Sequence, residues 1–210
     1  MSTLPAKAGA VLIGMLVDRS GSMAQYRTDM EDGLNSFIVE QTSLPGDAGV
    51  MLVEFDDSYE VVWPMQALSG LEGLRYRLKP RGGTKLFDSI GKFIGEINEQ
   101  LAEEDRWRPV ICVIVTDGQD NGSKEWTRAA VKEWINHQRT VYKWEFVFLG
   151  ANLDAVLEGE TFGVSKQFAL TFSVRRARES YQLLSRQVAQ LRAGNTSGFS
   201  NADRRKALGQ

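Results

Sequence analysis

The chain has 210 residues, of which 42% are hydrophobic and 25% are charged, and its formal net charge is -2 at pH 7. This length suits one well-buried domain, and the composition is that of an ordinary globular protein. The near balance of charge gives no general reason to expect binding to nucleic acid, and no apolar run approaches the roughly 20 residues of a membrane-spanning helix.

The first predicted elements are a strand, a helix and then two further strands. Residues 11–17 form an apolar run that predicts a buried strand. Residues 23–38 carry apolar side chains at three- and four-residue steps, which is the stripe of an amphipathic helix. Residues 49–55 and 59–63 are two more strands. A parallel crossover needs a dozen or more residues, so these two strands must form an antiparallel hairpin.

Helix and strand patterns then alternate as far as residue 172. An apolar stripe predicts a helix over residues 86–101, and residues 109–115 are the most apolar run, typical of a central strand. The remaining elements, in chain order, are a helix marked by Trp126, Ala130 and Trp134, a strand over 144–149, a short helix over 153–157 and a strand over 168–172. The pattern predicts an α/β fold: a Rossmann-like, doubly wound, mainly parallel six-stranded sheet with one antiparallel edge strand and helices on both faces.

The expected organisation is an N-terminal extension over residues 1–9, a domain over 10–173, a basic helix over 174–193 and a flexible tail over 194–210. From Val174 onward, eight basic residues face two acidic ones, so this part carries +6 and the preceding body -8. The helix has a heptad-like apolar stripe, which favours packing against the sheet and leaves a partner contact open. Gly, Ser, Asn and charged residues dominate the tail.

Three loops carry side-chain oxygens, and two of them directly follow predicted strands. Asp18, Ser20 and Ser22 alternate directly after the first strand, Thr84 follows a Gly-Gly pair at the start of a helix, and Asp117 follows the central strand. Ligands of open α/β sheets bind beyond the carboxyl ends of the strands. If the two strands are neighbours, both aspartates lie at one edge, where a cation between them would relieve their repulsion. Hard oxygen donors of this kind suit Mg²⁺.

Each of these pieces also has an ordinary structural explanation. Ser22 is a natural helix N-cap, and Asp117-Gly118 is a common turn sequence. Their coincidence at strand ends in one chain favours a metal site.

These residues also carry a family resemblance. The chain resembles the von Willebrand factor type A domain, a Rossmann-like module whose metal-ion-dependent adhesion site combines an Asp-x-Ser-x-Ser loop with a Thr and an Asp from two further loops. Asp18, Ser20, Ser22, Thr84 and Asp117 match those positions in order, and the resemblance spans roughly residues 10–172. It implies that they hold Mg²⁺ or Mn²⁺ directly or through water, and that an Asp or Glu of a partner protein completes the coordination.

The resemblance also extends to the setting of the protein. Short intracellular members of this kind occur in bacteria and their phages, which implies a cytoplasmic protein. Residues beside the three loops are expected to line the rim of the site: Arg19, Gly21, Met23, Lys85 and residues 119–121. The sole cysteine, Cys112, is expected to be a buried strand thiol.

Two other functions remain open. One is a structural or scaffolding domain that acts through its basic C-terminal helix and tail. The other, a metal-dependent phosphoryl hydrolase, is disfavoured, because Ser20 stands where such enzymes carry a second Asp and no Walker-type phosphate loop is present. The one histidine, His137, is expected in solvent near a helix end. Catalysis is therefore not expected, nor is a nucleic-acid or membrane partner.

Overall fold

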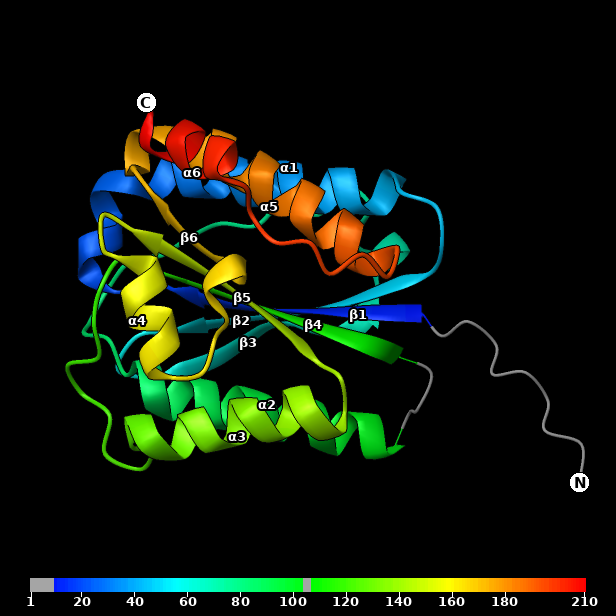
Figure 1. The fold of residues 1–210 in the computed structure, drawn as a ribbon, viewed down its shortest axis with the longest axis horizontal. Coiled ribbons are helices and arrows are strands. Elements are labelled where there is room, and N and C mark those ends of the chain that lie inside the picture. Colours follow the sequence, from blue (N-terminus) through cyan, green and yellow to red (C-terminus); the bar gives the residue numbers. More distant parts are fainter. Residues whose placement is uncertain (1–9, 104–106) are drawn as a thin grey trace, which may run out of the picture.

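The computed structural model describes residues 10–103 and 107–210, and its centre is a six-stranded sheet in the order β3-β2-β1-β4-β5-β6 (Figure 1). Neighbouring strands run parallel except for β2 and β3, which pair antiparallel at one edge. The predicted fold class is confirmed. The strands are β1 (Ala10–Asp18), β2 (Ala48–Phe55), β3 (Tyr59–Ala67), β4 (Trp107–Thr116), β5 (Glu145–Ala151) and β6 (Ala169–Phe172).

Helices cover both faces of the sheet: α1, α5 and α6 lie on one side, α2 and α3 on the other (Figure 1). None of the helices in the described ranges is long and apolar enough to span a membrane. The bounds are α1 (Arg27–Ser43), α2 (Leu86–Glu103), α3 (Arg128–Val141), α4 (Ala155–Thr161), α5 (Ala177–Arg192) and α6 (Asn201–Leu208), with 3-10 turns η1 (Gly21–Tyr26), η2 (Leu68–Leu71), η3 (Lys166–Phe168) and η4 (Val174–Arg176).

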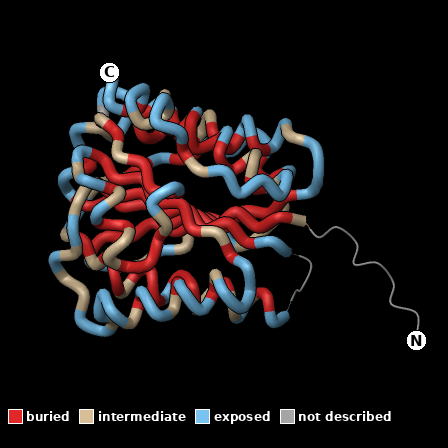
Figure 2. The backbone as a smooth tube through the Cα atoms, viewed as in Figure 1, coloured by how far each residue is buried: buried red, intermediate tan, exposed pale blue. Residues whose placement is uncertain are grey.

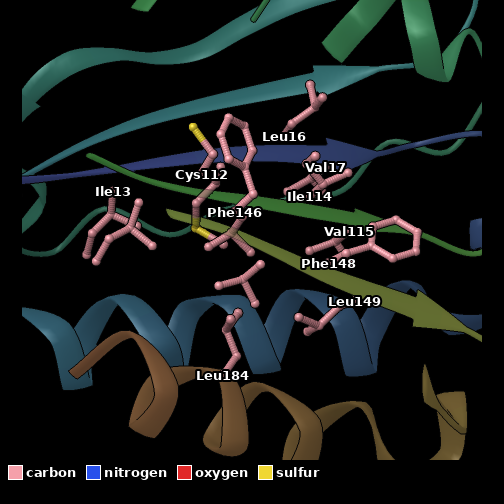
Figure 3. Packing of buried hydrophobic residues seen from close by; sticks show 14 of the residues in the cluster. Ile13, Leu16, Val17, Cys112, Ile114, Val115, Phe146, Phe148, Leu149 and Leu184 are labelled. Atoms are coloured by element: carbon pink, nitrogen blue, oxygen red, sulfur yellow. The ribbon is translucent and has the colours of Figure 1, made fainter. Parts of the chain in front are cut away.

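Burial follows this layering, with the sheet inside and the outer helix faces exposed (Figure 2). Cys112, Phe148 and Leu184 have no exposed surface, and Figure 3 shows Leu184 of α5 between its helix and the strand side chains. Strands covered on both faces need apolar residues at every position, which explains the continuous runs in β1 and β4. The prediction of a buried Cys112 thiol is confirmed.

The order of the strands places a ligand site at the carboxyl ends of β1 and β4. These two strands are direct neighbours, with Val17 paired to Val115. From β1 the chain continues to β2 on one side, and from β4 it continues to β5 on the other. The sheet therefore reverses its winding between β1 and β4, which is where doubly wound sheets bind ligands.

The basic helix α5 packs on the domain through its apolar stripe. Tyr181 lies against α1, where a Cβ added to Gly33 would come within 2.4 Å of its ring. Gln41 Nε2 donates to the Ser185 carbonyl oxygen at 2.9 Å, and Arg192 Nη1 donates to the Gln41 carbonyl oxygen at 2.7 Å. The sequence favours packing of this stripe against the sheet. Leu184 does face the strand side chains (Figure 3), and the contacts above show that the stripe also packs on α1.

The region predicted to be a flexible tail contains a helix that the sequence pattern did not indicate. Helix α6 begins with a capping box formed by Ser200 and Asp203, and it lies along β6, where the Ser173 amide donates to the Ala207 carbonyl oxygen at 3.1 Å. Ala207 is fully buried, but one small buried side chain in eight residues gives no periodic stripe. Trp126 also differs from prediction, because it precedes α3 instead of lying within it.

The contact between α1 and α5 predicts a strong effect of one methyl group. In Gly33→Ala the new Cβ overlaps the base of the Tyr181 ring, which cannot swing away, so we expect a loss of about 1–3 kcal/mol in the free energy of unfolding. Asp32→Ala, at an exposed position on the same helix, is the control and should change stability by less than about 0.5 kcal/mol. Urea denaturation measures both, and equal stability of the two variants would contradict this packing.

Candidate metal centre

Asp18 is the last residue of β1, and its carboxylate is fully buried. Its Oδ1 accepts a hydrogen bond from the Ser20 amide at 2.6 Å, and its Oδ2 accepts one from Thr116 Oγ1 at 2.5 Å. Thr116 ends the neighbouring strand β4. Asp18 therefore links the ends of the two central strands and fixes the start of the loop that follows β1.

A chain of hydroxyl contacts runs from this loop to the second aspartate. Ser20 Oγ lies 3.1 Å from Ser22 Oγ, and Ser22 Oγ donates to Asp117 Oδ1 at 2.8 Å. Ser22 is exposed and Asp117 is partly buried, whereas Ser20 is buried. The structure thus brings these three residues and Asp18 to one place, open to solvent on the Ser22 side.

Thr84 reaches the same edge from the loop that precedes α2. The Gly21 amide donates to the Gly82 carbonyl oxygen at 3.1 Å, which joins this loop to the first. Asn121 holds Thr84 from the third loop, because its Oδ1 accepts from the Thr84 amide at 2.8 Å. The Thr84 hydroxyl lies beside Gly118, since a Cβ added there would be 3.7 Å from Thr84 Oγ1. All five predicted ligand residues therefore lie at one edge of the sheet.

The two carboxylates make no ion pair with a side-chain cation in the part of the chain that the structure describes. Burial raises the pKa of Asp18 to about 6, although hydrogen bonds from Thr116 and Ser20 lower it, and the nearby Asp117 raises it further. Burial also raises the pKa of Asp117. Within the described residues, no ion pair reaches either aspartate.

This donor set fits a hard divalent cation. It consists of two carboxylates and three hydroxyls. Elsewhere in the described part of the chain, no group of three or more His, Cys, Asp or Glu residues is placed to hold a metal. Oxygen donors with few carboxylates suit Mg²⁺ and Mn²⁺, whereas structural zinc sites use nitrogen and sulfur.

Arg19 does not line the rim, contrary to the expectation from loop position. Its side chain is 3% exposed and turns away from Asp18 toward carboxylates of the β2–β3 hairpin. Its guanidinium contacts Glu54 at 2.9 Å, Asp56 at 2.8 Å and Glu60 at 2.6 Å. Burial alone would lower the pKa of Arg19, but these carboxylates raise it above its ordinary value. Arg19 anchors the loop over residues 19–22 to β2 and β3; this loop is called the metal loop below because it carries two of the candidate ligands.

Of the other residues expected at the rim, one is buried in the core, two join the third loop to α2 by hydrogen bonds, and the rest are exposed or partly buried. Met23 was expected at the rim but is fully buried, because it belongs to the hydrophobic core. Asp120 accepts from the Phe87 amide at 3.3 Å and, like Asn121, fastens the third loop to the start of α2. Gly21 and Gln119 are exposed and stay candidates for partner contact, and Lys85 is partly buried.

Sequence reasoning missed the part played by Thr116. Thr116 directly precedes Asp117 in the chain and supplies the hydroxyl that donates to Asp18. The available signal was its place at the end of the most apolar strand, where a polar side chain faces the neighbouring strand end. The anchoring role of Arg19 had a weaker signal, because Glu54 and Asp56 lie at the end of a different strand.

Comparison with known proteins shows which family this chain matches. The family model described as von Willebrand factor type A domain matches residues 13–119. No curated protein matches the chain.

Solved structures with the same fold share little sequence with this chain. Proximal thread matrix protein 1 from the mussel byssus is 14% identical, with a TM-score of 0.64 over 86% of this chain and 46% of that one. Another structure of that protein has a zinc-occupied MIDAS motif, at 14% identity and TM-score 0.62 over 88% and 47% of the two chains. The vWF domain of the type V pili tip protein Mfa5 from Porphyromonas gingivalis is 10% identical, with a TM-score of 0.64 over 94% of this chain and 100% of that one. This chain thus spans about half of the mussel protein.

The Arg19 network predicts a defined response to acid. Burial raises the pKa of Asp56, but hydrogen bonds from Ser58, Arg81 and Arg19 outweigh it and lower the pKa to about 2. The ionised form therefore stabilises the fold above the unfolded pKa of about 4, and this contribution is lost as the pH falls toward 2. Asp56→Asn should lose about 2 kcal/mol of stability at pH 7 and much less near pH 2.

Urea denaturation at several pH values between 7 and 2 measures this difference. Glu72→Gln, at an exposed position, is the control and should keep the stability of the wild type within about 0.5 kcal/mol. A gap between Asp56→Asn and wild type that stays constant from pH 4 to pH 2 would show that Asp56 does not act through its charge.

Proposed function

Because this chain belongs to the von Willebrand factor type A domain family, we propose that it is a protein-binding module that captures an acidic side chain of a partner through a divalent cation. The cation is Mg²⁺ or Mn²⁺, and its ligands are Asp18, Ser20, Ser22, Thr84 and Asp117, which bind directly or through water. One observation carries this proposal: two aspartates with no ion pair among the described residues lie in a hydrogen-bonded cluster with the hydroxyls of Ser20, Ser22 and Thr116.

Other observations support the same reading. The family often mediates metal-dependent protein interactions, and the mussel relative holds zinc at its MIDAS motif. For this chain the donor set favours Mg²⁺ or Mn²⁺ over zinc, because it contains neither histidine nor cysteine. The bound cation would supply an electrophilic position that accepts a carboxylate oxygen.

The buried and the exposed residues of the site would have different roles. Asp18 is held from below by Thr116 and the Ser20 amide, so its carboxylate stays in a fixed orientation. Ser22 lies on the open side, where a partner's Asp or Glu would approach. A single contact of this kind adds little affinity by itself, so the surface around it would set how tightly the partner binds.

We propose that the module is not an enzyme and acts in the cytoplasm of a bacterium or a phage-infected cell. His137, the one histidine, is exposed on α3 and contacts Tyr142, near the start of β5. It therefore lies toward the amino edge of the sheet, opposite the strand ends that carry Asp18 and Asp117. A base at that edge could not activate a nucleophile in the metal loops.

The proposal predicts metal uptake that depends on Asp18. Mg²⁺ or Mn²⁺ at a hundredfold excess over Kd should stabilise the wild type by about 2.7 kcal/mol, since the ion binds the folded state. Asp18→Ala should abolish both the heat of binding and the rise in Tm, whereas Glu72→Ala should keep both. Absence of a response in the wild type at millimolar ion would contradict the metal site.

The same variant tests partner capture. A cell lysate is passed over immobilised wild type, Asp18→Ala and Glu72→Ala, each with Mg²⁺ and with EDTA. Proteins that bind wild type and Glu72→Ala only when metal is present are the expected partners. Capture that survives both EDTA and Asp18→Ala would overturn metal-dependent binding.

The hydroxyl of Thr116 should matter for the metal although it is not a ligand. Thr116→Val keeps the shape of the side chain but leaves Asp18 Oδ2 without its donor, and loss of such a supporting contact typically costs about 10–100-fold in metal affinity. Isothermal titration with Mn²⁺ measures the change. Thr140→Val on the exposed surface of α3 is the matched control, and equal affinities of the two variants would exclude this positioning role.

A further inference from the structure

Four exposed cations meet at the carboxyl end of β6. Arg175 and Arg176 precede α5, and Arg205 and Lys206 belong to the last turn of α6. The two segments adjoin, because a Cβ added to Gly209 at the end of α6 would lie 3.2 Å from Arg176 Nε. These four residues are called the basic edge surface below.

The basic edge surface lies on the same edge of the sheet as the candidate metal centre. Asn152, which follows β5, connects the two: its amide donates to the Phe172 carbonyl oxygen at 2.9 Å, and its Nδ2 donates to the Tyr26 hydroxyl at 3.2 Å. Tyr26 ends η1, the turn that carries Ser22. Two strand spacings separate β4 from β6 and three separate β1 from β6, which corresponds to about 10–15 Å. Figure 1 shows the C-terminus on the side where β6 ends.

Three of the other basic residues of this segment contact groups of the protein itself, whereas Arg178 is exposed on α5 and lines a groove beside α1. Arg186 pairs with Asp203, Arg192 donates to the Gln41 carbonyl oxygen, and Arg204 donates to the carbonyl oxygens of Ala169 and Lys166. Apart from Arg178, the exposed basic residues of this segment that make none of these contacts lie in the basic edge surface, at the edge that carries the candidate metal centre.

Within the basic edge surface, the charges are largely uncompensated. Glu179 pairs with Arg176 at 2.9 Å and is also attracted to Lys206, but no ion pair among the described residues joins Arg175, Arg205 or Lys206. Cations at the end of α6 are favourable for its dipole, whereas Arg175 and Arg176 stand before the N-terminus of α5, where the dipole disfavours positive charge. Helix stability thus explains the positions of Arg205 and Lys206 but not those of Arg175 and Arg176.

We propose that the basic edge surface is a second part of the partner-binding surface, which rests on the function proposed above. It would bind further carboxylates of an acidic protein segment whose first carboxylate lies at the metal centre. An extended segment advances about 3.3 Å per residue, so a separation of 10–15 Å corresponds to about three to five residues. The partner would therefore carry acidic residues about three to five positions from its ligating Asp or Glu.

Two labelled peptides test this arrangement by fluorescence anisotropy with the full chain and Mg²⁺. Both are Gly-Ser dodecapeptides with one Glu; one also has three Glu residues beginning four positions later, and the other has Gln at those three positions. Charge reversal in Arg175→Glu/Lys206→Glu should weaken the acidic peptide about three- to tenfold and leave the Gln peptide unchanged. Arg175→Gln/Lys206→Gln should show a smaller loss in the same direction.

The control is Lys132→Glu/Lys143→Glu, which makes the same charge change on exposed residues at and just beyond α3. Equal loss in the control and the edge variant, or equal loss for both peptides, would overturn the second contact while metal-dependent binding stands. Binding of the acidic peptide that is unaffected by EDTA and by Asp18→Ala would overturn the proposed function and the shared surface together. A DNA duplex that competes more strongly than the acidic peptide would assign the basic edge surface to nucleic acid and overturn the inference.

Discussion

The structure depends on satisfying a carboxylate buried at the end of a central strand. Asp18 has no exposed surface, and burial raises its pKa to about 6. Hydrogen bonds from Thr116 and the Ser20 amide offset part of the cost of burying its charge. Among the described residues, no ion pair offsets the rest of this cost, and Asp117 adds a second negative charge nearby. A divalent cation at this edge is the simplest way to balance the pair.

A separate ion network keeps that charge from being neutralised internally. Arg19 is adjacent to Asp18 in the chain, yet its guanidinium turns to Glu54, Asp56 and Glu60. This orientation ties the metal loop to the β2–β3 hairpin through a buried cation that has three acidic partners of its own. As a result the loop is anchored, and the guanidinium of the arginine next to Asp18 in the chain is held by other carboxylates.

Local patterns predicted most of the fold and the five side chains that the structure brings together at one edge of the sheet. The apolar runs of β1 and β4 required a sheet covered on both faces, and the short link between β2 and β3 required a hairpin. Periodicity failed where few side chains are buried, as in α6, and where a tryptophan packs on a helix without belonging to it. Trp126 lies over Gly91 of α2 and stacks on Trp134 at 4.7 Å, so its apolar character reports packing and not helical position.

The sequence by itself determined the fold class, the five oxygen-bearing residues and their order along the chain, because these depend on periodicity and on residue chemistry. Tertiary structure alone decided which way Arg19 points, that Met23 is buried, and that Thr116 supports Asp18, since each depends on contacts between residues distant in sequence. It also decided where the positive charges of the C-terminal segment lie on the molecule. Net charge is a sum without direction, and only the packing of α5 and α6 places Arg175 and Lys206 at the edge that carries the metal centre.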